Sequence, residues 1–123
     1  IAERLNNQRI GLKPINVCIQ VKIDADDERE SVGHDEVREL INELKELENI
    51  KLRGLMGIPS LNSSLDERRN GFFKLHQLYK DLNDEGYGLD TLSMGMSSDY
   101  KIAIQNGSNM IRIGTVLFGE RRI

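Results

Sequence analysis

The sequence predicts an α/β fold in which four short parallel strands alternate with helices, as in half of a (β/α)8 barrel. Three observations predict it. Apolar residues recur at every second position in some segments and at every third or fourth position between them, so strands and helices alternate. Turns rich in Gly and Ser follow the last two strands, where barrels frequently bind phosphate. The first residues already have helical spacing, which predicts a chain that starts within a barrel.

The first half of the chain predicts two helices and two strands. Residues 1–7 space their apolar side chains as a helix does and end in polar residues, as the last turns of a helix do. Residues 15–23 carry β-branched side chains at every second position, which predicts a strand. Residues 35–48 predict an amphipathic helix. A second strand over residues 52–58 stops at Pro59, which has no N–H to donate to a sheet.

The second half continues the alternation. Residues 66–85 predict a longer helix with one aromatic and aliphatic face. Residues 89–94 predict the third strand, and a short helix is predicted to begin with Ser97 or Ser98 as its cap. Residues 110–113 predict the fourth strand. We expect a parallel sheet that is covered on both faces, in one domain over residues 1–123.

The same order of elements also fits a small open doubly wound sheet. That fold normally has a Gly-rich phosphate-binding turn after its first strand. Here the loop after Ile23 reads Asp-Ala-Asp-Asp-Glu-Arg-Glu, and its carboxylates would repel a phosphate. The half-barrel is therefore favoured over the doubly wound sheet.

Composition excludes several classes of function. Lys and Arg total 17 against 20 Asp and Glu, a net charge of -3, so nucleic acid is not the expected partner. No apolar run approaches the roughly 20 residues of a membrane span. Cys18 is the single cysteine, which predicts a reducing, cytoplasmic environment. With only His34 and His76 beside it, no metal site is expected.

The strongest candidate for a binding site is the segment Gly95-Met96-Ser97-Ser98-Asp99, at the carboxyl end of the third strand. Gly95 lets a ligand approach the backbone, and the two hydroxyls lie beside amides at the start of the next helix, which attract anions. The alternative is that the serines only cap that helix.

Arg112 is the second candidate, because it is the one charged residue of an otherwise apolar strand. A guanidinium in a buried strand keeps its charge and needs a partner. That partner is either Asp90, in an ion pair, or a ligand at the barrel mouth. Gly114 and Thr115 follow directly and repeat the pattern of a bare backbone beside a hydroxyl.

Four segments make a family resemblance visible. They are Leu-Arg-Gly-Leu-Met-Gly-Ile-Pro at 52–59, Leu-Ser-Met-Gly-Met-Ser-Ser-Asp at 92–99, Ile-Arg-Ile-Gly-Thr at 111–115 and Phe-Gly at 118–119. In this order they closely resemble the pyridoxal-phosphate homeostasis family (YggS/PROSC type), which is related to the alanine racemase barrel. The resemblance covers essentially the whole chain.

The resemblance implies the C-terminal half of a (β/α)8 TIM barrel of the alanine racemase-like type, which binds pyridoxal 5′-phosphate without established turnover and serves cofactor homeostasis. It places the cofactor phosphate against Ser97, Ser98, Gly114 and Thr115, and the pyridine nitrogen opposite Arg112. The Schiff-base lysine of the family is expected in the N-terminal half, which this chain lacks. The alternative is a fragment of a pyridoxal-phosphate-dependent racemase or decarboxylase with the same barrel.

Half of a barrel would leave two strand edges open, at residues 16–23 and 110–113. Exposed apolar edges are templates for pairing with another chain. We therefore expect the chain to self-associate or to pair with its missing half.

Overall fold

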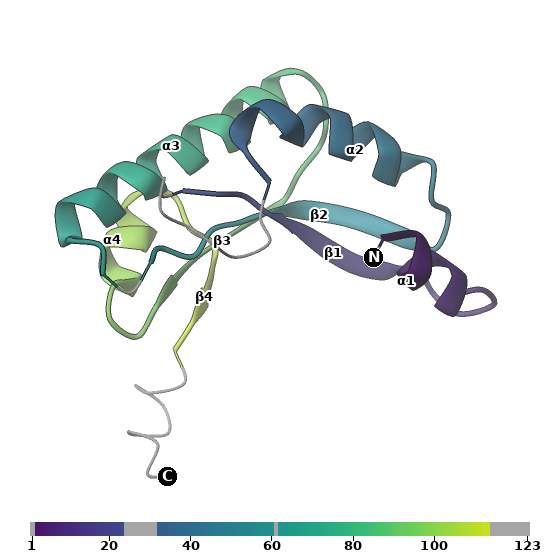
Figure 1. Ribbon diagram of the computed structural model, residues 1–123, viewed down its shortest axis with the longest axis horizontal. Coiled ribbons are helices and arrows are strands. Elements are labelled where there is room, and N and C mark those ends of the chain that lie inside the picture. Colours follow the sequence, from purple (N-terminus) through teal and green to yellow (C-terminus); the bar gives the residue numbers. More distant parts are fainter. Residues whose placement is uncertain (1, 24–31, 61, 114–123) are drawn as a thin grey trace, which may run out of the picture.

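Figure 1 shows the computed structural model, which describes residues 2–23, 32–60 and 62–113. Its helices and strands alternate along the chain as the sequence predicts. In order they are α1 (Ala2–Gln8), β1 (Ile15–Gln20), the 3-10 turn η1 (His34–Glu36), α2 (Val37–Lys45), β2 (Ile50–Met56), α3 (Leu65–Asp84), β3 (Thr91–Met96), α4 (Tyr100–Gln105) and β4 (Met110–Arg112). The acidic loop at 24–31 lies outside the described residues.

The four strands form one parallel sheet in the order β1-β2-β3-β4. Helices α2 and α3 lie on the same side of this sheet (Figure 1). Right-handed crossovers between successive strands place every helix on one face, as in a (β/α)8 barrel, whereas a doubly wound sheet reverses its strand order. The described part of the chain therefore has the barrel-type arrangement. The expectation that both faces of the sheet are covered is not met among the described residues, because the strand order β1-β2-β3-β4 does not reverse and α2 and α3 lie on one face.

The hydrophobic core lies between the sheet and this helical layer. The side chains that face the helices alternate along β1 and β3 with side chains that face away, as the pleat requires. The largest fully buried members are Val21, Val37, Ile41, Leu55, Phe72, Leu75, Leu82, Leu92 and Met94. The core fixes each strand against its own crossover helix, and so fixes where each strand ends.

The strand bounds shift by a few residues from those predicted. β3 begins at Thr91 rather than at Leu89, because side chains occupy the backbone of Leu89: its N–H donates to Asn83 Oδ1 (2.6 Å), and its carbonyl accepts from Asn83 Nδ2 and from the Tyr79 hydroxyl (both 3.0 Å). β1 ends earlier than predicted, because the chain after Gln20 pairs with Val32.

A β-bulge interrupts the pairing of β1 with β2. Val17 pairs with Leu52 and Cys18 pairs with Gly54, so Arg53 is an extra residue on β2. Gly54 itself lies hard against β3: a Cβ at this position would lie 1.6 Å from the Thr91 carbonyl oxygen. The two strands approach this closely only because residue 54 has no side chain.

Candidate functional site

The carboxyl ends of all four strands open on the same rim, because the strands are parallel. The structure brings three of the predicted site residues together there. Ser97 and Ser98 directly follow β3, and Arg112 ends β4 in register with Met96. Gly114 and Thr115, the other two predicted residues, lie outside the described residues.

Ser97 and Ser98 occupy the centre of a tight turn that runs from Met96 to Asp99. The Asp99 N–H donates to the Met96 carbonyl (3.1 Å), and the Met96 N–H donates to Asp99 Oδ1 (2.8 Å). The turn is thus closed twice, by a backbone bond and by a side-chain bond between the same two residues. The predicted serine cap is wrong: the residue that caps α4 is Asp99, and its side chain bonds back to Met96 instead of to the helix.

Asp99 is one of the few buried charged or polar residues in the described part of the chain. Its second carboxylate oxygen, Oδ2, lies 3.1 Å from Nη1 of Arg68, and the same Nη1 donates to Ser98 Oγ (3.2 Å). The two oxygens of Asp99 therefore have separate partners, the turn and the guanidinium. This division fixes the orientation of the carboxylate.

Arg68 comes from the first turn of α3. That helix begins with a capping box: the Glu67 N–H donates to Ser64 Oγ (3.1 Å), and the Ser64 N–H donates to Glu67 Oε1 (3.4 Å). Sequence reasoning missed Arg68. The one signal for it is its place directly after the capping box, which puts its side chain at the rim beside the end of β3.

Gly95 serves a different purpose from the one predicted. Its φ is 103°, and a Cβ there would lie 2.8 Å from Ala103 Cβ and 3.1 Å from Tyr100 Cα. The bare side of Gly95 is therefore filled by α4 and does not receive a ligand. The missing side chain lets α4 fold tightly against β3, which sets the position of the turn between them.

Arg112 points away from the helical layer. Ile111 lies beside Ala103 of α4, because both reach the space that a Cβ of Gly95 would occupy, and side chains alternate along a strand. Arg112 is exposed rather than buried as expected, since β4 is the last strand of the described sheet. The ion pair between Arg112 and Asp90 is not formed: Asp90 pairs with Arg53.

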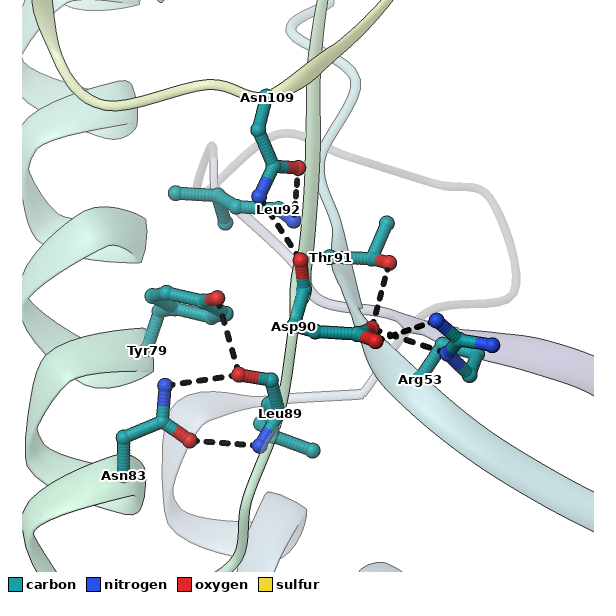
Figure 2. Close-up of polar contacts among 8 residues, drawn as sticks. All are labelled: Arg53, Tyr79, Asn83, Leu89, Asp90, Thr91, Leu92 and Asn109. Atoms are coloured by element: carbon teal, nitrogen blue, oxygen red, sulfur yellow. Dashed lines mark hydrogen bonds and ion pairs between the residues drawn. The ribbon is translucent and has the colours of Figure 1, made fainter.

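The opposite end of β3 is fixed by a polar network (Figure 2). Asp90 accepts from Arg53 Nε and from the Thr91 hydroxyl (both 2.9 Å), and these hydrogen bonds lower the pKa of Asp90 to about 2. The Asn109 side chain accepts from the Leu92 N–H (2.8 Å) and donates to the Asp90 carbonyl (2.9 Å). This network holds the amino end of β3, whereas the Met96–Asp99 turn holds its carboxyl end at the rim.

Groups of three or more metal-ligating side chains are absent from the described residues. His76 packs against Gly107, where a Cβ would lie 2.5 Å from its ring. Burial, followed by the charge of Lys74, lowers the pKa of His34. None of the helices described is long and apolar enough to cross a membrane.

Comparison with known proteins settles the family. Residues 2–122 match the family model described as alanine racemase, N-terminal domain. The chain belongs to this family. The alanine racemase-like fold class predicted from the sequence is thereby confirmed, together with its four parallel strands. The place of this segment as the C-terminal half of a barrel stays a prediction.

The resemblance to pyridoxal-phosphate homeostasis proteins that the sequence predicts is confirmed by curated relatives. The pyridoxal phosphate homeostasis protein of Pseudomonas aeruginosa is 43% identical over 122 residues, which cover 98% of this chain and 52% of the relative. The proteins of the same name from Pasteurella multocida and Escherichia coli K12 are 41% and 39% identical, with 98% of this chain covered in each case and 53% and 52% of the relatives. The chain spans about half the length of these relatives.

Two solved structures of PipY of Synechococcus elongatus share the fold. PipY of Synechococcus elongatus without pyridoxal phosphate aligns with a TM-score of 0.85 and 34% identity, covering 96% of this chain and 56% of PipY. PipY with pyridoxal phosphate bound aligns with a TM-score of 0.82 and 33% identity over the same shares. An arginine decarboxylase of Paramecium bursaria Chlorella virus aligns with a TM-score of 0.63 and 12% identity, over 92% of this chain and 36% of the enzyme, which shows likeness of fold alone.

Proposed function

We propose that this chain is part of a pyridoxal 5′-phosphate-binding protein of cofactor homeostasis, a carrier rather than an enzyme. The observation that carries the proposal is the likeness to PipY with pyridoxal phosphate bound, at 33% identity across 96% of the chain. The names of the curated relatives support the same role. A role in cofactor balance also agrees with a cytoplasmic location, where a lone Cys18 stays reduced.

The cofactor phosphate is assigned to the turn at the rim. Ser97 and Ser98 offer hydroxyl donors there, directly after β3. Hydroxyl groups are among the donors that bind phosphate oxygens. Gly114 and Thr115 complete the proposed phosphate site on the strength of the sequence.

Arg112 is assigned to the pyridine nitrogen of the cofactor. Pyridoxal phosphate, when bound, supplies an aldehyde and an electron-withdrawing ring. A guanidinium stays protonated and donates, so Arg112 would hold the ring nitrogen unprotonated and weaken that withdrawal. A site built in this way suits a carrier. The lysine for covalent attachment is expected outside this chain.

Replacing Ser97 with Ala tests the phosphate site. One lost hydrogen bond should weaken the binding of pyridoxal phosphate by about 1 kcal/mol, roughly fivefold in Kd, measured by isothermal titration calorimetry. The matched control is Thr91→Val, which removes a hydroxyl at the other end of β3 and should leave Kd unchanged. Equal affinity of Ser97→Ala and wild type would remove Ser97 from the site.

A racemase or decarboxylase of the same fold is the second candidate, because the matching family model is named for alanine racemase. Incubation of the full-length protein, which would carry the Schiff-base lysine, with pyridoxal phosphate and L-alanine or L-lysine separates the two functions. A carrier forms neither D-alanine nor the decarboxylated amine, whereas product that grows with time and is lost in Arg112→Ala would establish an enzyme.

A further inference from the structure

Arg68 and Asp99 form the most buried ion pair among the described residues. Their side chains are 13% and 3% exposed, whereas the neighbouring pair of Arg69 with Asp66 is 53% and 93% exposed. Removing two charges from water costs free energy that their mutual attraction does not always recover, so a buried pair is a poor device for stability alone. The position of this pair therefore needs another explanation.

The contacts of the pair tie two rim loops together. The Nε of Arg68 donates to Ser63 Oγ (3.0 Å), and Ser63 Oγ donates to the Ser60 carbonyl (2.6 Å), within the loop that follows β2. The Nη1 of Arg68 reaches Ser98 and Asp99, in the turn that follows β3. A planar guanidinium has its donors in a fixed fork, so it sets the separation and orientation of what it joins.

The hydrogen bond to Ser98 has a chemical consequence. Ser98 Oγ accepts from Arg68. Because Arg68 can only donate, the hydroxyl proton of Ser98 must be directed at a different acceptor. Ser98 is exposed at the rim, so that acceptor can be a ligand oxygen. Asp99 meanwhile neutralises the guanidinium and closes the turn through Met96.

We propose that Arg68 and Asp99 are positioning residues for the phosphate of the cofactor: together they hold the Met96–Asp99 turn and aim the Ser98 hydroxyl at the phosphate. This inference rests on the proposed function and adds two residues to it: Asp99, which closes the turn, and Arg68, which contacts the turn from α3. They act through Ser98 and the turn, and the phosphate itself contacts neither of them.

Three substitutions separate positioning from charge. Arg68→Gln removes the fork and the charge, Arg68→Lys keeps the charge without the fork, and Arg69→Gln is the matched control that removes one charge from the adjacent exposed position. Binding of pyridoxal phosphate, pyridoxal and inorganic phosphate to each purified protein is measured by titration calorimetry. Thermal unfolding of each variant confirms that it is folded at the titration temperature.

Both Arg68 variants should lose about tenfold in affinity for pyridoxal phosphate and for inorganic phosphate, the size of a disrupted charge-assisted contact, while the affinity for pyridoxal stays within about twofold. Arg69→Gln should match wild type for all three ligands. In a Ser98→Ala background Arg68→Gln should cost less than it does alone, because Arg68 acts through Ser98.

Full phosphate affinity in Arg68→Lys would overturn the inference, since charge alone would then suffice. Equal losses for pyridoxal and pyridoxal phosphate would also overturn it, because they would indicate a general structural defect. Failure of the wild-type protein to bind either pyridoxal phosphate or phosphate would instead contradict the proposed function. If Arg68→Gln unfolds, the Arg68→Lys and Ser63→Ala variants decide by the same ratio of pyridoxal phosphate to pyridoxal affinity.

Discussion

Asp90 is an exposed side chain whose ionisation contributes to the stability of the folded state in acid. Its carboxylate accepts from Arg53 on the bulge of β2 and from the Thr91 hydroxyl, and both bonds favour the ionised form. The folded pKa of about 2 therefore lies below the ordinary value of 3.8. A carboxyl with a depressed pKa stabilises the folded state only while it is ionised.

Asp90 should accordingly make unfolding depend on pH in the acid range. Its contribution is fully present above about pH 4 and is lost as the pH falls through the folded pKa of about 2. Urea unfolding of wild type and Asp90→Asn at several values between pH 2 and pH 6 measures it. Asp90→Asn should flatten the decline in stability at low pH, and Arg53→Met, which removes the partner, should flatten it similarly. An unchanged acid slope in both variants would contradict this role.

The limits of the sequence are clearest at single residues. Strands and helices alternate visibly along the sequence, and this alternation predicts that Ser97, Ser98 and Arg112 lie at the carboxyl ends of parallel strands, on one rim. The partners of Arg68 do not, because Ser98 and Asp99 lie 30 and 31 residues away and only the packing of α3 beside β3 brings them together. The hydrogen bond from the Met96 N–H to Asp99 Oδ1 depends on the conformation of the turn, which cannot be predicted from the residue types alone.

At the scale of elements, the pairing of β2 with β3 depends on a missing side chain. A Cβ at Gly54 would lie 1.6 Å from the Thr91 oxygen, and backbone cannot yield as a flexible side chain can. Arg53, the extra residue of the bulge, precedes Gly54 directly. The bulge, the close approach and the Arg53–Asp90 pair thus lie on one short stretch of chain.

Gly54→Ala should lower the free energy of unfolding by at least about 2 kcal/mol, because the two strands must separate to admit the methyl group. Chemical denaturation measures the change. Gly33→Ala is the control: its Cβ would meet only Glu36 Oε1 at 3.9 Å, and its φ of -68° is open to any residue. That variant should be neutral or gain up to about 1 kcal/mol. Similar losses in both variants would refute the steric explanation.

The elements themselves were within reach of the sequence because each has its own periodicity. Their ends were not, since tertiary contacts set them. β3 starts late because Asn83 and Tyr79 occupy the backbone of Leu89, and β1 ends early because Val32 pairs with it. The start of α3 lies within one residue of the prediction, and the capping box at Ser64, a local signal that the prediction did not use, fixes it.

At the scale of the molecule, the sheet formed by the described residues has one face without helices and an edge on either side. β1 and β4 each pair with a single strand among those described, and a groove of about 830 Å³ lies between α1, β1 and α2. Met110 of β4 is 52% exposed and, like Arg112, points to the face without helices. Such apolar edges promote association between chains.

We therefore expect the chain to associate reversibly at micromolar concentration, as sedimentation velocity would show by a sedimentation coefficient that rises with concentration. Met110→Lys places a charge on the β4 edge and should shift the equilibrium toward the monomer. Ile104→Lys is the control, since Ile104 is equally exposed, at 51%, but lies on α4. A monomeric wild-type chain, or equal effects of the two lysines, would contradict association through the edges.

The strand order also shapes the route by which the chain folds. Every strand pairs with its neighbour in sequence, but the loops that must close differ in length: Ser93 and Met110 are 17 positions apart, whereas Val17 and Leu52 are 35 apart. Halving a loop saves roughly 0.6 kcal/mol of closure entropy. The unit β3–α4–β4 is therefore favoured to form first, so the Met96–Asp99 turn is built before the longer connections from β1 to β2 and from β2 to β3 close.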